Sequence, residues 1–278
     1  MNNIFLHSNN GVLTDITEKV YRYQTQSYVV PDIVATQDYL YLGSRAPFNH
    51  YYFDFILDSV VASNTITAEY WDGREWITCY RTIDDTSGFT ENGFITFVPN
   101  KNKSWNVEST NDGNESVPGL TTINIYDMYW LRIKFSVDIP LGFTFRFIGQ
   151  KFSDDYDLSS EFPDLTRTQM LTAFGSGKTN WDEQHCKAAE IIAQDLIKSD
   201  VIDDKGQILV REEFTLASVQ KVAQLIFNAL GDDYLDQRDK AEQEYKNRMN
   251  KSIYKVDKNE NGLLDKGESK QRVGFMSR

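Results

Sequence analysis

The order of hydrophobic and polar positions changes near residue 150 of this 278-residue chain. Before that point, short segments alternate apolar and polar side chains and are separated by clusters of Gly, Asn, Asp and Pro. This alternation is typical of antiparallel β-strands joined by turns. After about residue 165, apolar residues recur every three or four positions, which gives a helix one apolar face. The pattern therefore predicts an α+β protein in two parts.

The first half predicts an antiparallel β-sandwich or jelly roll of about eight strands. Its clearest local signal is Asp72-Gly73 between two alternating runs, because Gly73 accepts the positive φ that a tight hairpin turn requires. The segment 100–120 is rich in Asn, Ser, Thr and Gly and predicts a long loop, either a partner contact or a solvated insertion. The predicted strands are 39–43, 50–55, 65–71, 75–80, 93–98, 129–137 and 143–148.

The second half predicts a small helical bundle. Asn180, with Glu183 three residues later, has the pattern of a capping box at the start of a first helix. Thr215 is expected to cap a second helix that ends at Gly231. A third helix, from about 234 to 250, is more polar and needs neighbours or projects from the body. The turn residues 203–206 suggest a small hairpin between the first two helices.

These patterns predict four consecutive parts. A β-sandwich domain occupies residues 1–150, and a polar linker follows at 151–164. A helical domain then covers 165–250, and a C-terminal extension runs from 251 to 278. The break in composition between the two halves predicts that they are separable domains.

Charge and cysteine content narrow the class of protein. The net charge is −12, and without a basic stripe we expect no sequence-specific nucleic-acid binding. Cys79 and Cys186 fall in different predicted domains, which favours free thiols in a reducing compartment. The sequence has neither a long uninterrupted apolar run nor the start of a signal peptide, so we expect synthesis in a cytoplasm and no membrane insertion.

The strongest motif lies in the C-terminal extension, where residues 257–268 match the register of an EF-hand loop. Gly262 stands where that loop makes its sharp turn, and Glu268 stands where a bidentate carboxylate closes it. Only residues 269–278 follow, so a complete exit helix is not expected and a structural Ca²⁺ is favoured over a calcium switch. The predicted ligands are Asp257, Asn259, Asn261, the Leu263 carbonyl, Asp265 and Glu268.

The rest of the extension has too few apolar residues to fold alone, because ordering each residue costs about 1–2 kcal/mol. We therefore expect it to dock on a neighbouring subunit or another protein. The residues expected to bind that partner are Ile253, Tyr254, Val273, Phe275, Met276 and Arg278.

Other motifs favour packing over catalysis, and no enzyme activity is predicted. Residues 175–179, Gly-Ser-Gly-Lys-Thr, look like the end of a phosphate-binding loop, but Thr172 stands where that loop needs glycine. His185 and Cys186 have no second Cys or His at ligand spacing. Six aromatic residues could instead line a sugar platform or form the core and edges of a sandwich: Tyr70, Trp71, Trp76, Trp105, Tyr129 and Trp130.

Two segments carry a resemblance to a known class of protein. Residues 66–76, Ile-Thr-Ala-Glu-Tyr-Trp-Asp-Gly-Arg-Glu-Trp, and 129–133, Tyr-Trp-Leu-Arg-Ile, resemble a β-sandwich module in structural proteins of tailed bacteriophages. The C-terminal part is similar to the helical head–tail connector, or adaptor, proteins that sit beneath the portal. Minimal adaptors lack a sandwich. The resemblance therefore also allows that the protein is another neck protein or a tail or baseplate component.

The resemblance implies a structural virion protein in the neck, between capsid and tail, without catalytic residues. It implies a homo-oligomeric ring, usually dodecameric, whose partners are the portal protein and neighbouring neck or tail proteins. The alternative is a carbohydrate-binding sandwich module of a tail or baseplate protein.

Overall fold

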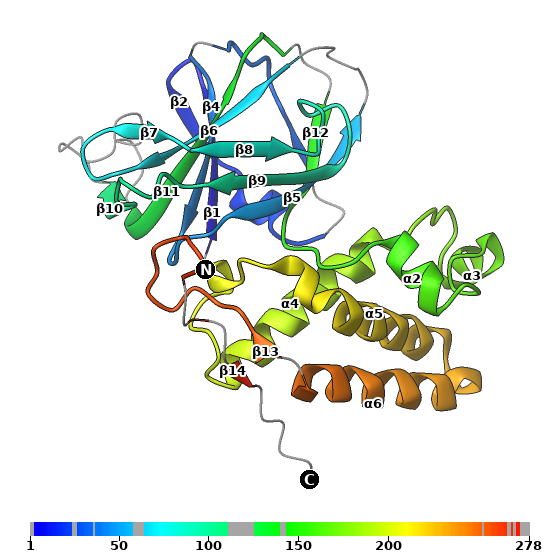
Figure 1. The fold of residues 1–278 in the computed structure, drawn as a ribbon. Helices are drawn as coiled ribbons and strands as arrows, with labels where there is room; N and C mark the ends of the chain where they lie inside the picture. The colour runs from blue at the N-terminus through cyan, green and yellow to red at the C-terminus, as the bar shows by residue number, and fades with distance from the viewer. Residues whose placement is uncertain are drawn as a thin grey trace. The chain divides into compact units, whose positions relative to one another are not determined.

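The computed structural model describes residues 3–23, 27–35, 37–57, 64–110, 125–139, 143–251, 253–265, 268 and 271–272 (Figure 1). The chain forms two compact units. Unit 1 consists of Met1–Gly149 together with Asn259–Leu263, and unit 2 consists of Gln150–Lys258 and Leu264–Arg278. Five residues of the C-terminal extension thus belong to the β-rich unit.

The described part of unit 1 contains two antiparallel sheets, of seven and five strands. The larger has the order β2-β1-β4-β11-β6-β7, with β10 also paired to β11; the smaller has the order β3-β12-β5-β9-β8. A short helix, α1 (Thr17–Val20), follows β2. The strands are β1 (Asn3–Asn9), β2 (Val12–Asp15), β3 (Tyr28–Val29), β4 (Tyr39–Ser44), β5 (His50–Leu57), β6 (Ile66–Trp71), β7 (Trp76–Thr78), β8 (Arg81–Asp84), β9 (Gly93–Val98), β10 (Val107–Thr110), β11 (Ile125–Phe135) and β12 (Phe143–Gly149).

Local turn chemistry explains the hairpin that the sequence predicted. β6 and β7 pair antiparallel across the four-residue turn 72–75, which contains Asp72 and Gly73. Gly73 has φ +94°, and the Asp72 carboxylate accepts the backbone N–H groups of Arg74 and Glu75, each at 2.9 Å. Part of the predicted 100–120 loop is strand β10, and residues 111–124 lie outside the described residues.

The larger sheet has buried hydrophobic side chains on both faces. Neighbouring residues on one strand point to opposite faces, and the pairs Leu40/Tyr41 and Leu131/Trp130 enter different clusters accordingly. One cluster also contains side chains of the smaller sheet, among them Phe53, Phe55, Ile95, Phe97 and Phe145. The other contains Leu6, Tyr41, Trp71, Met128 and Trp130. The buried aromatic residues of the first half are therefore divided between two hydrophobic clusters of unit 1, one on each face of the larger sheet.

Unit 2 is helical, and Figure 1 shows α5 and α6 running alongside each other, while α4 packs against α5. α6 is polar but packs through one face, where Ala241, Tyr245 and Met249 are buried. The elements are α2 (Asp155–Glu161), α3 (Thr168–Phe174), α4 (Asp182–Lys198), α5 (Thr215–Leu230), α6 (Leu235–Lys251), the 3-10 turns η1 (Lys205–Gln207), η2 (Arg211–Phe214) and η3 (Asp232–Tyr234), and the short strands β13 (Ile253–Tyr254) and β14 (Gln271–Arg272).

Three local predictions in this half were wrong. The supposed linker contains α2, because Asp154 and Asp157 each accept the other's backbone N–H and form a capping box. The supposed hairpin at 203–206 is the turn η1, because the Asp204 carboxylate caps it through Gly206 N. The first long helix starts from Trp181 as its N-cap, one residue after the expected Asn180.

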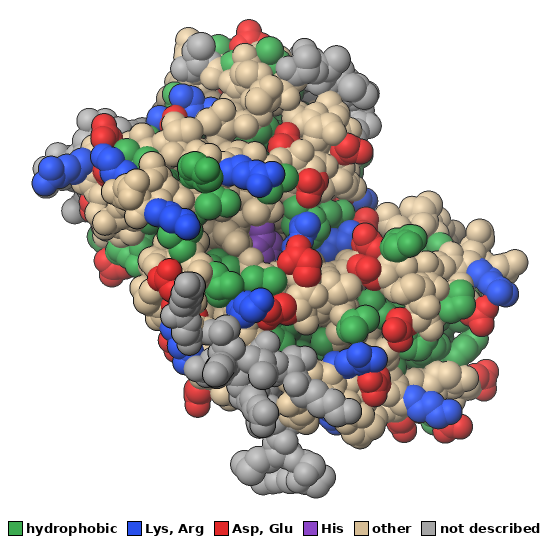
Figure 2. Space-filling model, viewed as in Figure 1, with side chains coloured by type: hydrophobic (Ala, Val, Ile, Leu, Met, Phe, Trp, Pro, Cys, Tyr) green, Lys and Arg blue, Asp and Glu red, His purple; other side chains and the backbone are tan. Residues whose placement is uncertain are grey.

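The α+β class holds, with a strand-rich first part and a helical second part. Across the described residues, each helix is too short or too polar to traverse a lipid bilayer. On the face that Figure 2 shows, the described Lys and Arg side chains are scattered among acidic and polar ones rather than gathered in one area.

Because His7 is buried, we expect unit 1 to lose stability in acid. Its imidazole is buried, and Nδ1 lies 3.0 Å from the Tyr28 hydroxyl oxygen. Burial lowers the pKa of His7 to about 4, although the nearby Asp38 charge opposes the shift. The folded state keeps His7 neutral while the unfolded chain takes up a proton below about pH 6.5. We therefore expect about 3 kcal/mol of stability to be lost as the pH falls from 6.5 to 4.

Urea unfolding of the parent and His7→Gln at a series of pH values measures this effect. The variant should lose less stability than the parent over that interval. Parallel stability curves for the two proteins would show that His7 stays protonated or is solvated in the folded state.

Candidate functional site

The 257–268 loop follows β13, and all of its residues except Lys266 and Gly267 are described. Asp257 is buried, and its backbone N–H donates to the Gln207 carbonyl at 3.0 Å. Gly262 has φ +74°, the left-handed backbone that the sixth position of an EF-hand loop requires. Backbone and sequence thus agree at the turn of the loop.

Glu268 ties the two ends of the loop together. Its Oε1 accepts the Lys258 N–H at 3.0 Å, and its Oε2 accepts the Asp265 N–H at 2.9 Å. Within the loop, Asn261 Oδ1 accepts the Leu263 N–H at 2.7 Å. Among the described residues, no three His, Cys, Asp or Glu side chains are gathered closely enough to hold a metal ion. The side chains of the loop carry the oxygen atoms that calcium prefers, and its last carboxylate is hydrogen-bonded to the backbone.

The middle of the loop is also a packing element of unit 1. A Cβ on Gly262 would lie 3.2 Å from Pro99 Cγ and 3.4 Å from both Pro47 Cβ and Trp105 Cε3. Glu260, Asn261 and Leu263 line a hollow of about 330 Å³ together with residues 100–105. Gly262 is thus fixed both by its φ and by close neighbours, a second constraint that the sequence did not reveal.

The residues expected to bind a partner lie in different surroundings. Tyr254 is buried in unit 2, where its ring stacks on Phe214 with centroids 4.6 Å apart and its hydroxyl donates to the Met249 carbonyl at 3.0 Å. We therefore assign Tyr254 to the core and remove it from the docking surface. Ile253 pairs through its backbone with Arg272. The other four expected residues, Val273, Phe275, Met276 and Arg278, lie outside the described residues.

A hydrogen-bonded Ser–His–Asp arrangement lies in unit 2. Ser153 Oγ is 2.7 Å from both His185 Nδ1 and Ser218 Oγ, and His185 Nε2 is 3.2 Å from Asp155 Oδ1. In a hydrolytic triad the serine faces Nε2 and the carboxylate faces Nδ1, the reverse of this order. Ser153 and His185 are both buried, so the arrangement joins α2, α4 and α5 rather than presenting a nucleophile. The sequence did not reveal this arrangement, because residues 153–155 were predicted to belong to the linker 151–164.

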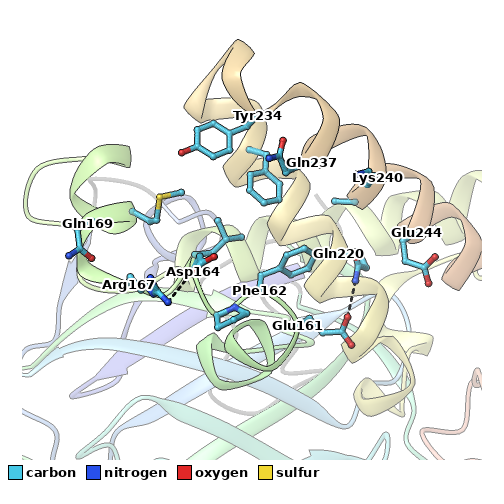
Figure 3. Close-up of a pocket in the computed structure, with 15 residues that line it drawn as sticks. Glu161, Phe162, Asp164, Arg167, Gln169, Gln220, Tyr234, Gln237, Lys240 and Glu244 are labelled. Carbon is cyan, nitrogen blue, oxygen red and sulfur yellow. Dashed lines mark hydrogen bonds and ion pairs between the residues drawn. The ribbon is translucent and has the colours of Figure 1, made fainter.

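The helical unit contains a groove of about 890 Å³ between the α2–α3 segment and the α5–α6 pair (Figure 3). Phe162, Phe227 and Tyr234 form its aromatic floor, with successive ring centroids 6.1 and 5.8 Å apart. Pockets of this size and apolar character commonly bind ligands or peptides. The residues of the groove come from 161–170 and 220–244, too far apart in sequence for a local pattern to reveal it.

Other candidates from the sequence have packing roles. Lys178 of the Gly-Ser-Gly-Lys-Thr segment lies over the Trp181 and Phe174 rings, 5.1 and 5.2 Å from their centroids, and its Nζ is 3.7 Å from Glu183 Oε2. Of the six aromatics considered as a sugar platform, Tyr70, Trp71, Trp105 and Trp130 are buried, and Trp76 and Tyr129 are partly buried. These six residues do not form a flat exposed surface.

No protein-family model matches the chain, and comparison with curated proteins finds no relative. The functional argument therefore rests on the residues and their geometry.

Proposed function

We propose that this chain is a non-enzymatic structural protein of a tailed bacteriophage, an adaptor whose ring of about twelve copies joins portal to tail in the virion neck. The observation that carries the proposal is the way in which unit 2 ends. The β13–β14 ladder pairs Gln271–Arg272 with Ile253–Tyr254, and Tyr254 is buried in the helical unit. Val273, Phe275, Met276 and Arg278 follow this ladder in the sequence. An anchored segment with large apolar side chains and a guanidinium suits attachment to a neighbouring protein.

The β-rich unit would serve this role as a sandwich or jelly roll. The hydrophobic cluster common to both sheets supports face-to-face packing, because such packing buries the inner side chains of each sheet together. The carbohydrate-binding alternative has less support, since most of the candidate aromatic side chains are buried. Specific retention of a glycan by the purified protein on an array would favour that alternative.

The non-enzymatic proposal is supported by the Ser153–His185–Asp155 arrangement, in which Ser153 and His185 are buried. Together with Ser218 it joins three helices. Proteins of this kind act through their surfaces, so the decisive experiments measure assembly.

Removing Gln271–Arg278 is expected to leave both units folded while preventing assembly with the portal protein. The deletion removes β14 and the apolar segment, and it leaves every described residue of the hydrophobic clusters in place. Native mass spectrometry of the chain mixed with portal protein is the test, with circular dichroism as the folding control. We expect a ring of about twelve copies of the 32.1 kDa chain for the parent and none for the truncated protein. Equal assembly of the two proteins would refute the proposed role of the extension.

We also propose that the 257–268 loop binds a structural Ca²⁺. The side chains of Asp257, Asn259, Asn261, Asp265 and Glu268 and the Leu263 carbonyl would hold it, in the register that an EF-hand loop uses. The bound ion would fix the bend of the extension and lower the entropy lost when the extension docks.

Calcium at about 100 times its Kd is expected to stabilise the parent by about 2.7 kcal/mol, because it binds the folded loop alone. Glu268→Gln should abolish this stabilisation by weakening the bidentate ligand. Glu260→Gln changes an exposed acid at a non-ligand position of the same loop and is the matched control. Calorimetry and thermal unfolding with Ca²⁺ or Mg²⁺ measure both effects. A parent protein that gives no calcium-dependent heat or shift in Tm would refute the site.

A further inference from the structure

Residues 259–263, the middle of the 257–268 loop, rest on unit 1. An EF-hand loop lies between two helices, which hold its ends. Here the strand β13 precedes the loop in place of a helix. Residues 259–263 belong to the β-rich unit, where Gly262 is buried. The support for the turn of the loop therefore comes from unit 1.

Three side chains of unit 1 surround this turn. Pro47 lies between β4 and β5, and Pro99 and Trp105 lie between β9 and β10. Each of the three has an atom within 3.2–3.4 Å of the position that a Cβ on Gly262 would occupy. A methyl group there would be crowded on every side, so the backbone of the turn packs directly against these residues. We call Pro47, Pro99 and Trp105 the cradle.

The rest of unit 1 holds the cradle in place. Trp105 is 7% exposed, and its indole N–H donates to the Trp130 carbonyl at 3.1 Å. Its ring packs against Tyr70, with centroids 5.5 Å apart. The Tyr70 hydroxyl oxygen lies 3.3 Å from the carbonyl oxygens of Asn100 and Lys103, which fixes the chain just before Trp105. Because proline has a fixed φ, the backbone at the other two cradle residues is also restrained. The cradle is therefore a preformed surface.

The turn that rests on the cradle carries several of the proposed calcium ligands. Asn259, Asn261 and the Leu263 carbonyl belong to it, and Asn261 Oδ1 accepts the Leu263 N–H at 2.7 Å. A turn that is held in its binding conformation loses less entropy when the ion binds. By linkage, a cradle that favours the calcium-bound turn is itself stabilised by calcium to the same degree.

We propose that Pro47, Pro99 and Trp105 are positioning residues of the calcium site, so that unit 1 sets the affinity of the loop for Ca²⁺. The cradle holds Gly262 in its left-handed conformation and takes over the support that flanking helices give in an EF-hand. Calcium in turn protects the cradle from local opening. This inference rests on the proposed calcium site and can fail while that site stands.

Calcium titration of Trp105→Phe by calorimetry tests the cradle. The variant keeps an aromatic ring but removes the indole edge beside Gly262, so its Kd for Ca²⁺ should rise at least about fivefold. Trp71→Phe makes the same change in the hydrophobic cluster on the opposite face of the larger sheet. Its Kd should stay within about twofold of the parent value, because the two sites are independent. Circular dichroism shows whether both variants are folded.

Equal Kd values for the parent and Trp105→Phe would overturn the inference and leave the calcium site intact. An equal rise in both variants would also overturn it, because a general loss of stability in unit 1 would then be the cause. Pro99→Ala removes another cradle contact outside the aromatic core and should raise the Kd in the same direction. A parent that binds no calcium would refute the calcium site itself.

Hydrogen exchange followed by mass spectrometry tests the reverse effect. Saturating Ca²⁺ should slow exchange of the backbone amides of residues 100–105 several-fold, since local opening there would release the bound turn. Glu268→Gln, which lacks the bidentate carboxylate, should show no such slowing. Protection confined to residues 257–268 would mean that calcium binds without the cradle and would contradict the proposal.

Discussion

Trp181→Ala is expected to lower the free energy of unfolding of unit 2 by about 3–5 kcal/mol, the usual cost of removing a large buried aromatic side chain. The indole is completely buried, with its ring edge-on to Phe174 at a centroid distance of 4.9 Å. Its N–H donates to the Leu165 carbonyl at 2.9 Å. The substitution thus leaves a cavity and removes the hydrogen bond that holds the segment before α3.

Trp181→Phe is the matched control, since it keeps an aromatic ring and loses the N–H donor. Its loss should be clearly smaller, and the difference between the two variants measures the cavity. Chemical unfolding followed by circular dichroism is suitable because it does not depend on tryptophan fluorescence. A loss of stability below about 1 kcal/mol would mean that unit 2 repacks around the vacated space.

Arg146→Ala is expected to destabilise unit 1 by about 3–5 kcal/mol, because it leaves a carboxylate in the sheet without its cation. The Asp54 side chain has no exposed surface, and its oxygens lie 2.6 Å from Arg146 Nη2 and 3.1 Å from Arg146 Nε. Asn92 Nδ2 also donates to Asp54 at 2.9 Å. The pair joins β5 and β12, which are neighbours in the smaller sheet.

The double variant Asp54→Asn, Arg146→Ala distinguishes an uncompensated charge from lost packing. It should recover most of the stability, since the remaining amide carries no charge. Arg167→Ala, which breaks an ion pair with 67% and 75% exposed side chains, should cost no more than about 1 kcal/mol. Denaturant unfolding of the four proteins completes the comparison. If the double variant were as unstable as Arg146→Ala, packing of the guanidinium stem would be the cause.

Features encoded by adjacent residues could be predicted from the sequence. Asp72-Gly73 specified a hairpin because the aspartate side chain and the positive φ of glycine act within four residues. Gly262 specified the turn of the calcium-type loop for the same reason. The strands predicted at 93–98 and 129–137 are likewise present as β9 and within β11, although β11 begins earlier, at Ile125.

Features that join distant residues could not be predicted in this way. Asp155 was predicted to lie in a polar linker. Its carboxylate nevertheless accepts a hydrogen bond from the Trp181 backbone N–H and is hydrogen-bonded to His185 Nε2, and these residues lie 26 and 30 positions away. Tyr254 was predicted to bind a partner, because no neighbouring residue in the sequence indicates that the Phe214 ring covers it. The same reason explains why the groove, which brings residues 161–170 to 220–244, was not expected.

The position of this protein within a tailed phage particle tests the central claim most directly. Electron microscopy of particles decorated with gold-labelled antibody fragments against the β-rich unit gives that position. The adaptor proposal predicts label at the neck, between capsid and tail, with many copies per particle. Label at the distal end of the tail, or on no part of the particle, would contradict it.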